Sequence, residues 1–233
     1  MPAKKTKLAI ASSGVDGAEI TLISYSAPGS GSGKVRGRAV IAHGAGADQS
    51  HPFMVKFSEG LAERGIETTT FNFLYTERKK KSPDKNDALE LVWTKVFESM
   101  KKPVVIGGKS MGGRIASQVV ANGVDAAGLF FLGYPLHPPG QPKKLRIAHW
   151  PKIKVPCLFV QGSRDAFGSV EELARYTDKL GGAFDVHPVR GGDHSLNVGK
   201  KDLKEQATTQ EAVLADAMDA VAEHVASLCA KSK

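Results

Sequence analysis

The feature that most limits the fold of this chain is a repeated alternation of short apolar runs with helical patterns. Such alternation is typical of βαβ units, which build a mainly parallel sheet with helices on both faces. Runs such as Val104-Val105-Ile106 are apolar without interruption, as strands buried on both faces should be. The chain is therefore predicted to have an α/β fold. The strand-like runs cover residues 38–42, 66–73, 103–107, 127–133, 155–161 and 184–189, and the helical patterns cover residues 52–64, 87–100, 110–122 and 170–180.

The two ends of the chain complete this organisation. An alternating pattern over residues 18–25 predicts one more strand, and the glycine- and serine-rich segment 28–33 predicts a turn after it. We expect one domain over residues 1–233, with residues 1–6 and 231–233 flexible. Near the C-terminus, one face of a predicted helix carries an apolar stripe at steps of three and four residues, made of Leu214, Met218, Val221, Val225 and Leu228.

Composition excludes several classes of protein. With 41% hydrophobic residues among 233, the chain can bury a substantial core. No run approaches the roughly 18 apolar residues that a membrane span needs, and the apolar run at residues 8–11 is too short for a signal-peptide core. We therefore expect a cytoplasmic protein without a membrane span. The two cysteines, Cys157 and Cys229, do not support a disulfide framework or a metal cluster, so we expect neither a metal nor another cofactor.

The formal net charge is +8, and basic residues concentrate at residues 78–81 and 143–146 and at Lys200, Lys201 and Lys204. No aromatic residues interleave these runs, so we expect no nucleic-acid partner. The simpler interpretation is that the runs are solvated loops that favour solubility. The alternative is that residues 79–81 and 143–146 attract an anionic small-molecule substrate.

A G-x-S-x-G motif, Gly108-Lys109-Ser110-Met111-Gly112, lies between a buried strand and a helical pattern. In this context the motif predicts a tight strand-to-helix turn that holds a serine hydroxyl above the edge of the sheet. Glycines are needed because larger residues would collide across the turn. Without its flanking strand and helix, the motif would often be a glycine-rich turn with an incidental serine. Ser110 is therefore the predicted nucleophile.

A serine becomes an effective nucleophile when a histidine accepts its proton and a carboxylate orients that histidine. In this kind of site the acid and then the histidine follow the serine along the chain. His194 fits because it lies in a loop directly after the last strand, and Asp165 fits because it follows the strand at residues 155–161. Asp193 is a nearby rival, but adjacent side chains point apart, and Glu171 is a more distant alternative. The histidines excluded by their position are His43, His51, His137, His149, His187 and His224.

Hydrolysis through such a serine also needs two backbone N–H groups that bind the oxyanion of the tetrahedral intermediate. One is expected at Met111, the residue after the nucleophile. The other is expected at Ala45, in the small-residue loop His43-Gly44-Ala45-Gly46. The alternative for this loop is a simple glycine turn.

The motifs H-G-A-G, G-K-S-M-G-G-R, Y-P-L-H, V-Q-G-S-R-D and G-G-D-H-S-L follow one another in this order. With them, the chain from about residue 17 resembles the small α/β-hydrolase-like proteins related to dienelactone hydrolases. The element Tyr134-Pro135-Leu136-His137 is similar to a subgroup with a testis-expressed vertebrate member and a subunit of the NSL histone-acetyltransferase complex. The resemblance implies an α/β-hydrolase fold and a triad of Ser110, Asp165 and His194, but no particular substrate.

Lipases and many esterases carry a lid between the strands that here end near residue 133 and start near residue 155. In this chain the segment is short and rich in proline and lysine, so we expect a minimal cap that leaves a long acyl chain uncovered. A small soluble ester, lactone or thioester is the expected substrate. Candidate substrate contacts, each of which also suits core packing or the surface, are His43, Phe53, Tyr75 and His137.

These residues predict a serine hydrolase that transfers an acyl group to water. Ser110 attacks a carbonyl carbon, His194 accepts its proton, and Asp165 fixes the imidazole tautomer. The N–H groups of Ala45 and Met111 bind the oxyanion. The alternative is a non-catalytic scaffold that kept the fold and binds partners through its basic surface, because fold alone does not prove function.

Overall fold

A computed structural model of the chain describes residues 3–10, 18–26 and 35–231, so the turn predicted at residues 28–33 lies outside the described residues. Within them, eight strands form one sheet in the order β1-β2-β4-β3-β5-β6-β7-β8. β2 pairs antiparallel with β1 and with β4, whereas the pairs from β4 through β8 are parallel. The strands are β1 (Lys4–Ile10), β2 (Ala18–Tyr25), β3 (Gly37–Ala42), β4 (Ile66–Phe71), β5 (Val105–Lys109), β6 (Gly128–Leu132), β7 (Cys157–Gly162) and β8 (Phe184–Val189).

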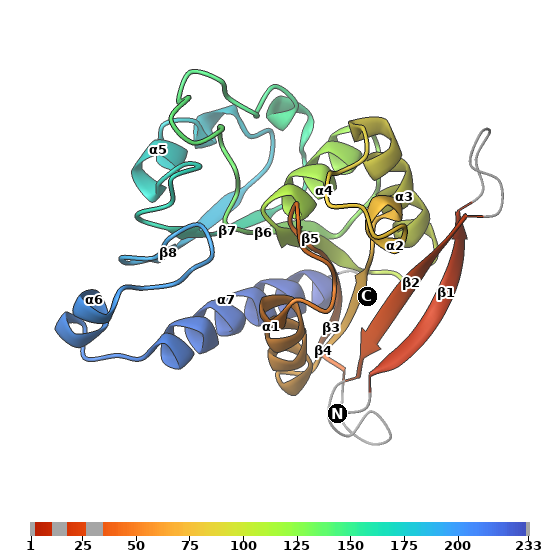
Figure 1. Cartoon of the computed structure of the whole chain (residues 1–233), viewed down its shortest axis with the longest axis horizontal. Coiled ribbons are helices and arrows are strands. Elements are labelled where there is room, and N and C mark those ends of the chain that lie inside the picture. Colours follow the sequence, from red (N-terminus) through yellow and green to blue (C-terminus); the bar gives the residue numbers. More distant parts are fainter. Residues whose placement is uncertain (1–2, 11–17, 27–34, 232–233) are drawn as a thin grey trace.

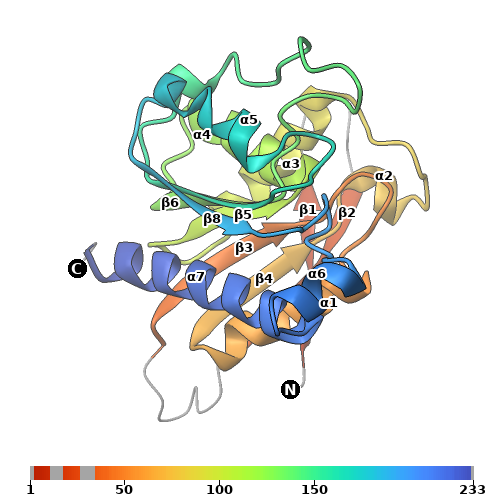
Figure 2. The same cartoon turned by 90° about the vertical axis from the view of Figure 1, so that its left-hand side faces the viewer.

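Helices cover both faces of this sheet: α1 and α7 lie on one face, and α3 and α4 lie on the other (Figures 1 and 2). The two largest clusters of buried apolar side chains match these two faces, one with Trp93 and Ile115 and the other with Phe57 and Val221. The predicted α/β fold with a mainly parallel sheet is therefore confirmed. The helices are α1 (Pro52–Glu63), α2 (Leu74–Glu77), α3 (Asn86–Glu98), α4 (Met111–Ala121), α5 (Val170–Ala174), α6 (Lys200–Glu205), α7 (Gln210–Lys231) and the 3-10 helices η1 (Trp150–Lys152) and η2 (Thr177–Lys179).

The central elements lie close to their predicted bounds, but two predictions need correction. Residues 4–6 are not a flexible start, because they pair with β2, where Lys4 lies opposite Ser24 and Thr6 opposite Leu22. The sequence pattern misses β1 because this edge strand exposes its lysine side chains and shows little apolar alternation. The helix predicted at residues 170–180 consists of two shorter pieces, α5 and η2.

The order of the parallel strands determines where loops can meet. The chain passes from β3 to β4 on one side and later reaches β5 on the other side of β3, so its direction of winding reverses between β3 and β5. At such a point, the loops after the two strands leave a crevice between them. Ala42 ends β3 and Lys109 ends β5, so the H-G-A-G loop and the G-x-S-x-G turn face each other there.

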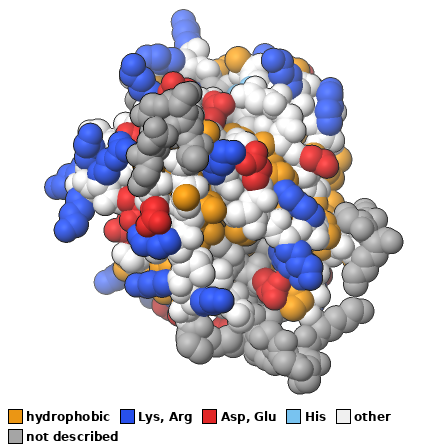
Figure 3. Space-filling view, turned by 90° about the vertical axis from the view of Figure 1, so that its right-hand side faces the viewer, with side chains coloured by type: hydrophobic (Ala, Val, Ile, Leu, Met, Phe, Trp, Pro, Cys, Tyr) orange, Lys and Arg blue, Asp and Glu red, His pale blue; other side chains and the backbone are white. Residues whose placement is uncertain are grey.

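Figure 3 shows the side of the molecule on which β1 and β2 lie in Figure 1. Lys and Arg side chains are interspersed there with Asp and Glu and do not form one basic patch. This mixed distribution is typical of a solvated surface. Within the described ranges, no helix is both long enough and apolar enough to cross a membrane.

Candidate active site

The serine of the G-x-S-x-G motif lies in a strained turn between β5 and α4. Ser110 has a φ of 50° and a ψ of −117°, a combination that residues other than glycine rarely adopt. A Cβ at Gly108 or Gly112 would collide with the carbonyl oxygen of Ala42 in the neighbouring β3. The glycines thus allow α4 to start directly against the sheet, and the turn presents Ser110 at the carboxyl end of β5.

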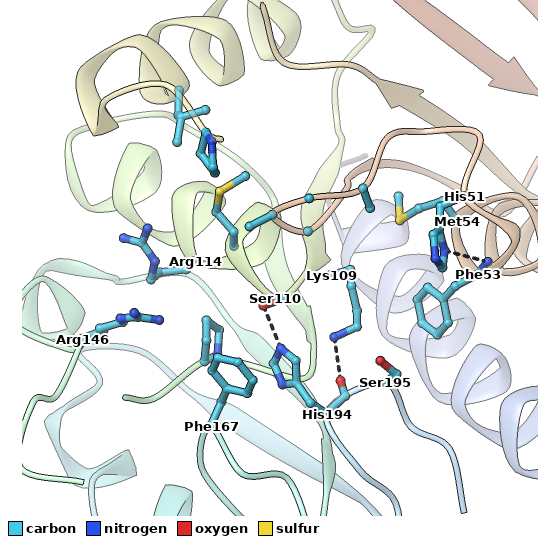
Figure 4. A pocket seen from close by; sticks show the side chains of 18 of the residues that line it. His51, Phe53, Met54, Lys109, Ser110, Arg114, Arg146, Phe167, His194 and Ser195 are labelled. Carbon is cyan, nitrogen blue, oxygen red and sulfur yellow. Dashed lines mark hydrogen bonds between the residues drawn. The ribbon is translucent and has the colours of Figure 1, made fainter. Parts of the chain in front are cut away.

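Three side chains from separate loops form a continuous hydrogen-bonded chain, and Figure 4 shows its link between Ser110 and His194. His194 Nε2 lies 2.8 Å from Ser110 Oγ, and His194 Nδ1 lies 2.8 Å from Asp165 Oδ2. Because an ionised carboxylate only accepts, Nδ1–H donates to Asp165, and Nε2 is left to accept the hydroxyl proton of Ser110. A histidine that activates a serine requires this tautomer. The structure therefore brings together the side chains predicted as nucleophile, base and acid.

Asp165 is held by groups on both of its carboxylate oxygens. Its side chain is 0% exposed, Gln161 Nε2 donates to Oδ2 at 2.9 Å, and the Phe167 N–H donates to Oδ1 at 2.7 Å. The Phe167 ring also stacks on the imidazole of His194, with centroids 4.1 Å apart. The two donors fix the plane of the carboxylate, and the stacked ring limits rotation of the imidazole.

The rival acids have other positions. Asp193 Oδ1 accepts from the backbone N–H groups of Ser195 at 2.7 Å and Asn197 at 2.9 Å, so Asp193 shapes the loop that carries His194. Glu171 is exposed in the first turn of α5, whereas Asp165 is the carboxylate that lies 2.8 Å from His194 Nδ1. The geometry therefore favours Asp165 as the acid.

The two N–H groups predicted to bind the oxyanion border the same cavity as Ser110. Met111 begins α4, and N–H groups in the first turn of a helix have no acceptor within it. The Gly44 carbonyl accepts from His43 Nδ1 at 2.9 Å. Because the trans peptide directs its C=O and N–H to opposite sides, the Ala45 N–H points away from the buried His43 ring. The arrangement thus suits two donors for an oxyanion.

Of the four predicted substrate contacts, Phe53 lines the cavity, whereas His43, Tyr75 and His137 do not. His43 is buried beneath the H-G-A-G loop, and this burial lowers its pKa. Tyr75 is buried with its ring in a T-shaped contact with His43. His137 is buried with Nε2 3.5 Å from Glu172 Oε1. These three side chains are buried and do not line the cavity over Ser110.

The cavity over Ser110 has a volume of about 970 Å³, near the upper end of the roughly 300–1,000 Å³ typical of small-molecule sites. Figure 4 shows Arg114 and Arg146 on one side of Ser110 and His51 and Phe53 on the other. The segment between β6 and β7, all of which is described, contains only η1 as a helix, which agrees with a minimal cap.

Lys109 lines the cavity and anchors the loop that carries His194. Its Nζ donates to the backbone carbonyl of His194 at 2.6 Å (Figure 4). Burial lowers the pKa of Lys109 to about 8, against smaller raising effects of Asp165 and Asp193. Near neutral pH most molecules therefore keep a partly buried ammonium next to the serine. Among the described residues, no group of three or more His, Cys, Asp or Glu side chains is placed to hold a metal ion.

Sequence reasoning missed several side chains that support or line this site. Gln161 closes an otherwise apolar strand just before Asp165, and that buried polar position was a usable signal. Lys109 stands at the variable position before the serine of the G-x-S-x-G motif, and the motif alone predicts no role for it. Arg146 belongs to a basic run whose simpler interpretation was a solvated loop, and Phe167 carried no signal.

Comparisons with known structures show the same architecture. The chain is similar to Est1E from Butyrivibrio proteoclasticus, with 16% identity, a TM-score of 0.65, and coverage of 89% of this chain and 96% of that one. It is similar to a dienelactone hydrolase from Anabaena variabilis, with 17% identity, a TM-score of 0.62, and coverage of 91% and 95%. An alpha-beta serine hydrolase homologue from Coxiella burnetii has 16% identity, a TM-score of 0.66, and coverage of 92% and 97%.

At these identities the likeness shows the fold alone, and it confirms the predicted α/β-hydrolase fold. The sequence also matches a family described as an alpha/beta hydrolase domain, over residues 35–226. This match begins just before β3 and ends within α7, so it includes every loop that contributes to the site. The chain therefore belongs to this alpha/beta hydrolase family.

Proposed function

We propose that the protein is a serine hydrolase that transfers an acyl group from a small soluble ester, lactone or thioester to water. The observation that carries this proposal is the hydrogen-bonded chain from Ser110 through His194 to Asp165, with 2.8 Å at both links. The same arrangement recurs on unrelated folds wherever a serine hydroxyl must be activated. Similar structures named as a dienelactone hydrolase and a serine hydrolase homologue support the same class.

The reaction has two halves. His194 Nε2 accepts the hydroxyl proton while Ser110 Oγ attacks the carbonyl carbon, and the carbonyl π electrons move to the oxygen. The N–H groups of Ala45 and Met111 bind this oxyanion. Its collapse breaks the bond to the leaving group, which takes the proton from His194. Water then repeats these steps on the acyl-enzyme and releases the acid, while Asp165 stabilises the imidazolium without accepting its proton.

The size of the substrate follows from the cap. The β6–β7 segment has no helix other than η1 to cover a long acyl chain, and the cavity volume of about 970 Å³ suits a small molecule. The finer relationship, to the subgroup with the testis-expressed and histone-acetyltransferase-complex members, is part of this proposal and rests on the Y-P-L-H motif. A cytoplasmic location is likewise proposed from the sequence alone.

The competing function is a scaffold that binds partners through its basic surface. Activity measurements on p-nitrophenyl esters from acetate to decanoate, a lactone and a thioester separate the two functions. We expect the fastest turnover with the shortest acyl chains and no turnover by Ser110→Ala, with an unchanged melting temperature as the control for folding. A preference for decanoate over acetate would contradict the small substrate. No turnover of any compound by folded wild-type protein would favour the scaffold.

A further inference from the structure

Two arginines on one side of the cavity have no carboxylate partner. Arg114 and Arg146 both line the cavity over Ser110 (Figure 4), and neither makes an ion pair within the described part of the chain. The protein therefore leaves positive charge on this wall without a partner. Arginines elsewhere that do pair with a carboxylate, at distances of 2.6 to 2.9 Å, are Arg36, Arg38, Arg64 and Arg164.

Both arginines are held in place by neutral groups. Arg114 Nη1 donates to Gln118 Oε1 at 3.1 Å and to Asn86 Oδ1 at 3.4 Å. The backbone of Arg146 is fixed because the Tyr134 hydroxyl donates to its carbonyl at 2.8 Å, and its own N–H donates to a backbone carbonyl at 2.8 Å. These contacts hold the Arg114 side chain and the Arg146 backbone in place without neutralising either charge, as a preorganised anion site requires.

The surroundings make the charge of Arg114 unfavourable when no anion is bound. Burial lowers the pKa of Arg114 and the charge of Arg146 acts in the same direction, against smaller raising effects of Tyr134 and Glu90. Burial, and to a smaller degree the charge of Arg114, lower the pKa of His149 to about 4, so this nearby histidine is neutral near pH 7. Among the described lining residues, Asp84 is acidic, whereas Lys109 adds a further cation. A bound anion would offset this excess of positive charge.

We propose that Arg114 and Arg146 form a subsite for a carboxylate carried by the substrate, so that the hydrolysed ester is an anion. This inference rests on the proposed hydrolase function and adds the class of substrate. Each guanidinium presents a planar fork of N–H donors that matches a carboxylate, and two forks satisfy the acceptor positions of one carboxylate group. The carboxylate then lies on the arginine side of Ser110, and the apolar part of the substrate lies toward Phe53 (Figure 4).

Two kinds of ester carry such a carboxylate: one has it on the acyl part and the other on the alcohol part. Two matched pairs of compounds distinguish these two kinds of ester. Monoethyl glutarate is compared with ethyl valerate, and 4-acetoxybenzoate is compared with p-tolyl acetate. In each pair a methyl group replaces the carboxylate, so the two esters differ chiefly in charge.

The kinetic test uses the preference for charge, the ratio of kcat/KM for the anionic ester to kcat/KM for its neutral partner. Wild-type protein should prefer the anionic ester in at least one pair. The ratio should fall about 10- to 100-fold in Arg114→Gln and in Arg146→Gln, the size of a lost charge-assisted hydrogen bond. Arg146→Gln changes a residue outside the helices, so it keeps the test available if Arg114→Gln destabilises α4.

Arg175→Gln is the matched control, because it makes the same change of charge at an exposed residue after α5 that does not line the cavity. Its ratio should stay within about twofold of wild type, as for most surface substitutions. No preference for either anionic ester in an active wild-type protein would overturn the subsite. An equal fall of the ratio in Arg175→Gln would also overturn it, because the effect would then come from net charge alone.

Binding to Ser110→Ala separates the subsite from the hydrolase function, because binding needs no turnover. Monoethyl glutarate and 4-acetoxybenzoate are titrated into this variant by calorimetry, and the tighter ligand should bind about 10- to 100-fold more weakly once Arg146→Gln is added. Inorganic phosphate is the comparison ligand, since a guanidinium fork also fits phosphate. Tighter binding of phosphate than of both esters would overturn the carboxylate assignment. Binding of an ester that the wild type does not hydrolyse would support the subsite and contradict the hydrolase function.

Discussion

The two sides of Ser110 differ in how their polar groups are satisfied. On one side, His194 and Asp165 form hydrogen bonds with each other and with groups around them. On the other side, neutral groups bind the Arg114 side chain and the Arg146 backbone, and neither arginine has an ion pair within the described residues. The first side is complete without a ligand, whereas the second lacks a negative partner. The chemistry and the substrate choice that we propose thus belong to different sides of Ser110.

The largest effect is expected when the hydrogen-bonded side with His194 and Asp165 is disrupted. Asp165→Asn should lower kcat by about 10⁴-fold, as loss of the aspartate does in other triads, because an amide no longer holds His194 in the required tautomer. Asp193→Asn is the matched control on the neighbouring loop and should cause a much smaller loss. Steady-state kinetics with p-nitrophenyl acetate measures both variants. Equal losses would contradict the assignment of Asp165 as the acid.

A smaller effect is expected from His43, whose Nδ1–H donates to the Gly44 carbonyl and so orients the H-G-A-G loop. An Asn side chain places its amide nitrogen near the position of Nδ1, so His43→Asn keeps a donor for the Gly44 carbonyl, whereas His43→Gln does not. His43→Gln should lower kcat by about 100-fold with little change in KM, as when one oxyanion donor is lost. His43→Asn should retain most of the rate. Equal losses of rate and of melting temperature in the two variants would make His43 a packing residue only.

The smallest effect concerns Lys109 and is measured as stability. Its pKa of about 8 lies below the usual 10.5, so between these pH values the unfolded chain binds more protons than the folded protein. The free energy of unfolding therefore rises with pH in this window, by at most about 1.4 kcal/mol per pH unit from this group. Lys109→Met removes the contribution. Chemical denaturation at about pH 8 and pH 10 should show wild type gaining stability relative to the variant, and parallel changes would contradict a depressed pKa.

Much of the side with His194 and Asp165 could be predicted from the sequence. The order of strands and helices places the ends of β5, β7 and β8 at one edge of the sheet, so Ser110, Asp165 and His194 had to approach one another. The glycines around the serine left little choice of turn. β1 escaped prediction because its pattern is that of an exposed edge, with lysines where a central strand has apolar residues.

The wall with the arginines was harder to predict. Arg114 stands one turn along α4, but the proximity of Arg146 depends on the path of the irregular β6–β7 segment, which has no periodicity to interpret. His43 and Tyr75 lie in or near loops where the direction of a side chain does not follow from spacing, and both turn into the core. Residue type alone therefore does not distinguish a lining side chain from a supporting one.

The most direct test of the central claim, that Ser110 is an activated nucleophile, is labelling with a fluorophosphonate probe followed by intact-mass and peptide mass spectrometry. Wild-type protein should gain a label on Ser110, and Asp165→Asn should react far more slowly. Ser110→Ala should remain unlabelled, with a melting temperature unchanged or slightly raised, because it removes only the hydroxyl of a residue placed for function rather than for stability. Failure of the folded wild-type protein to react, or equal labelling of Ser110→Ala, would contradict the account.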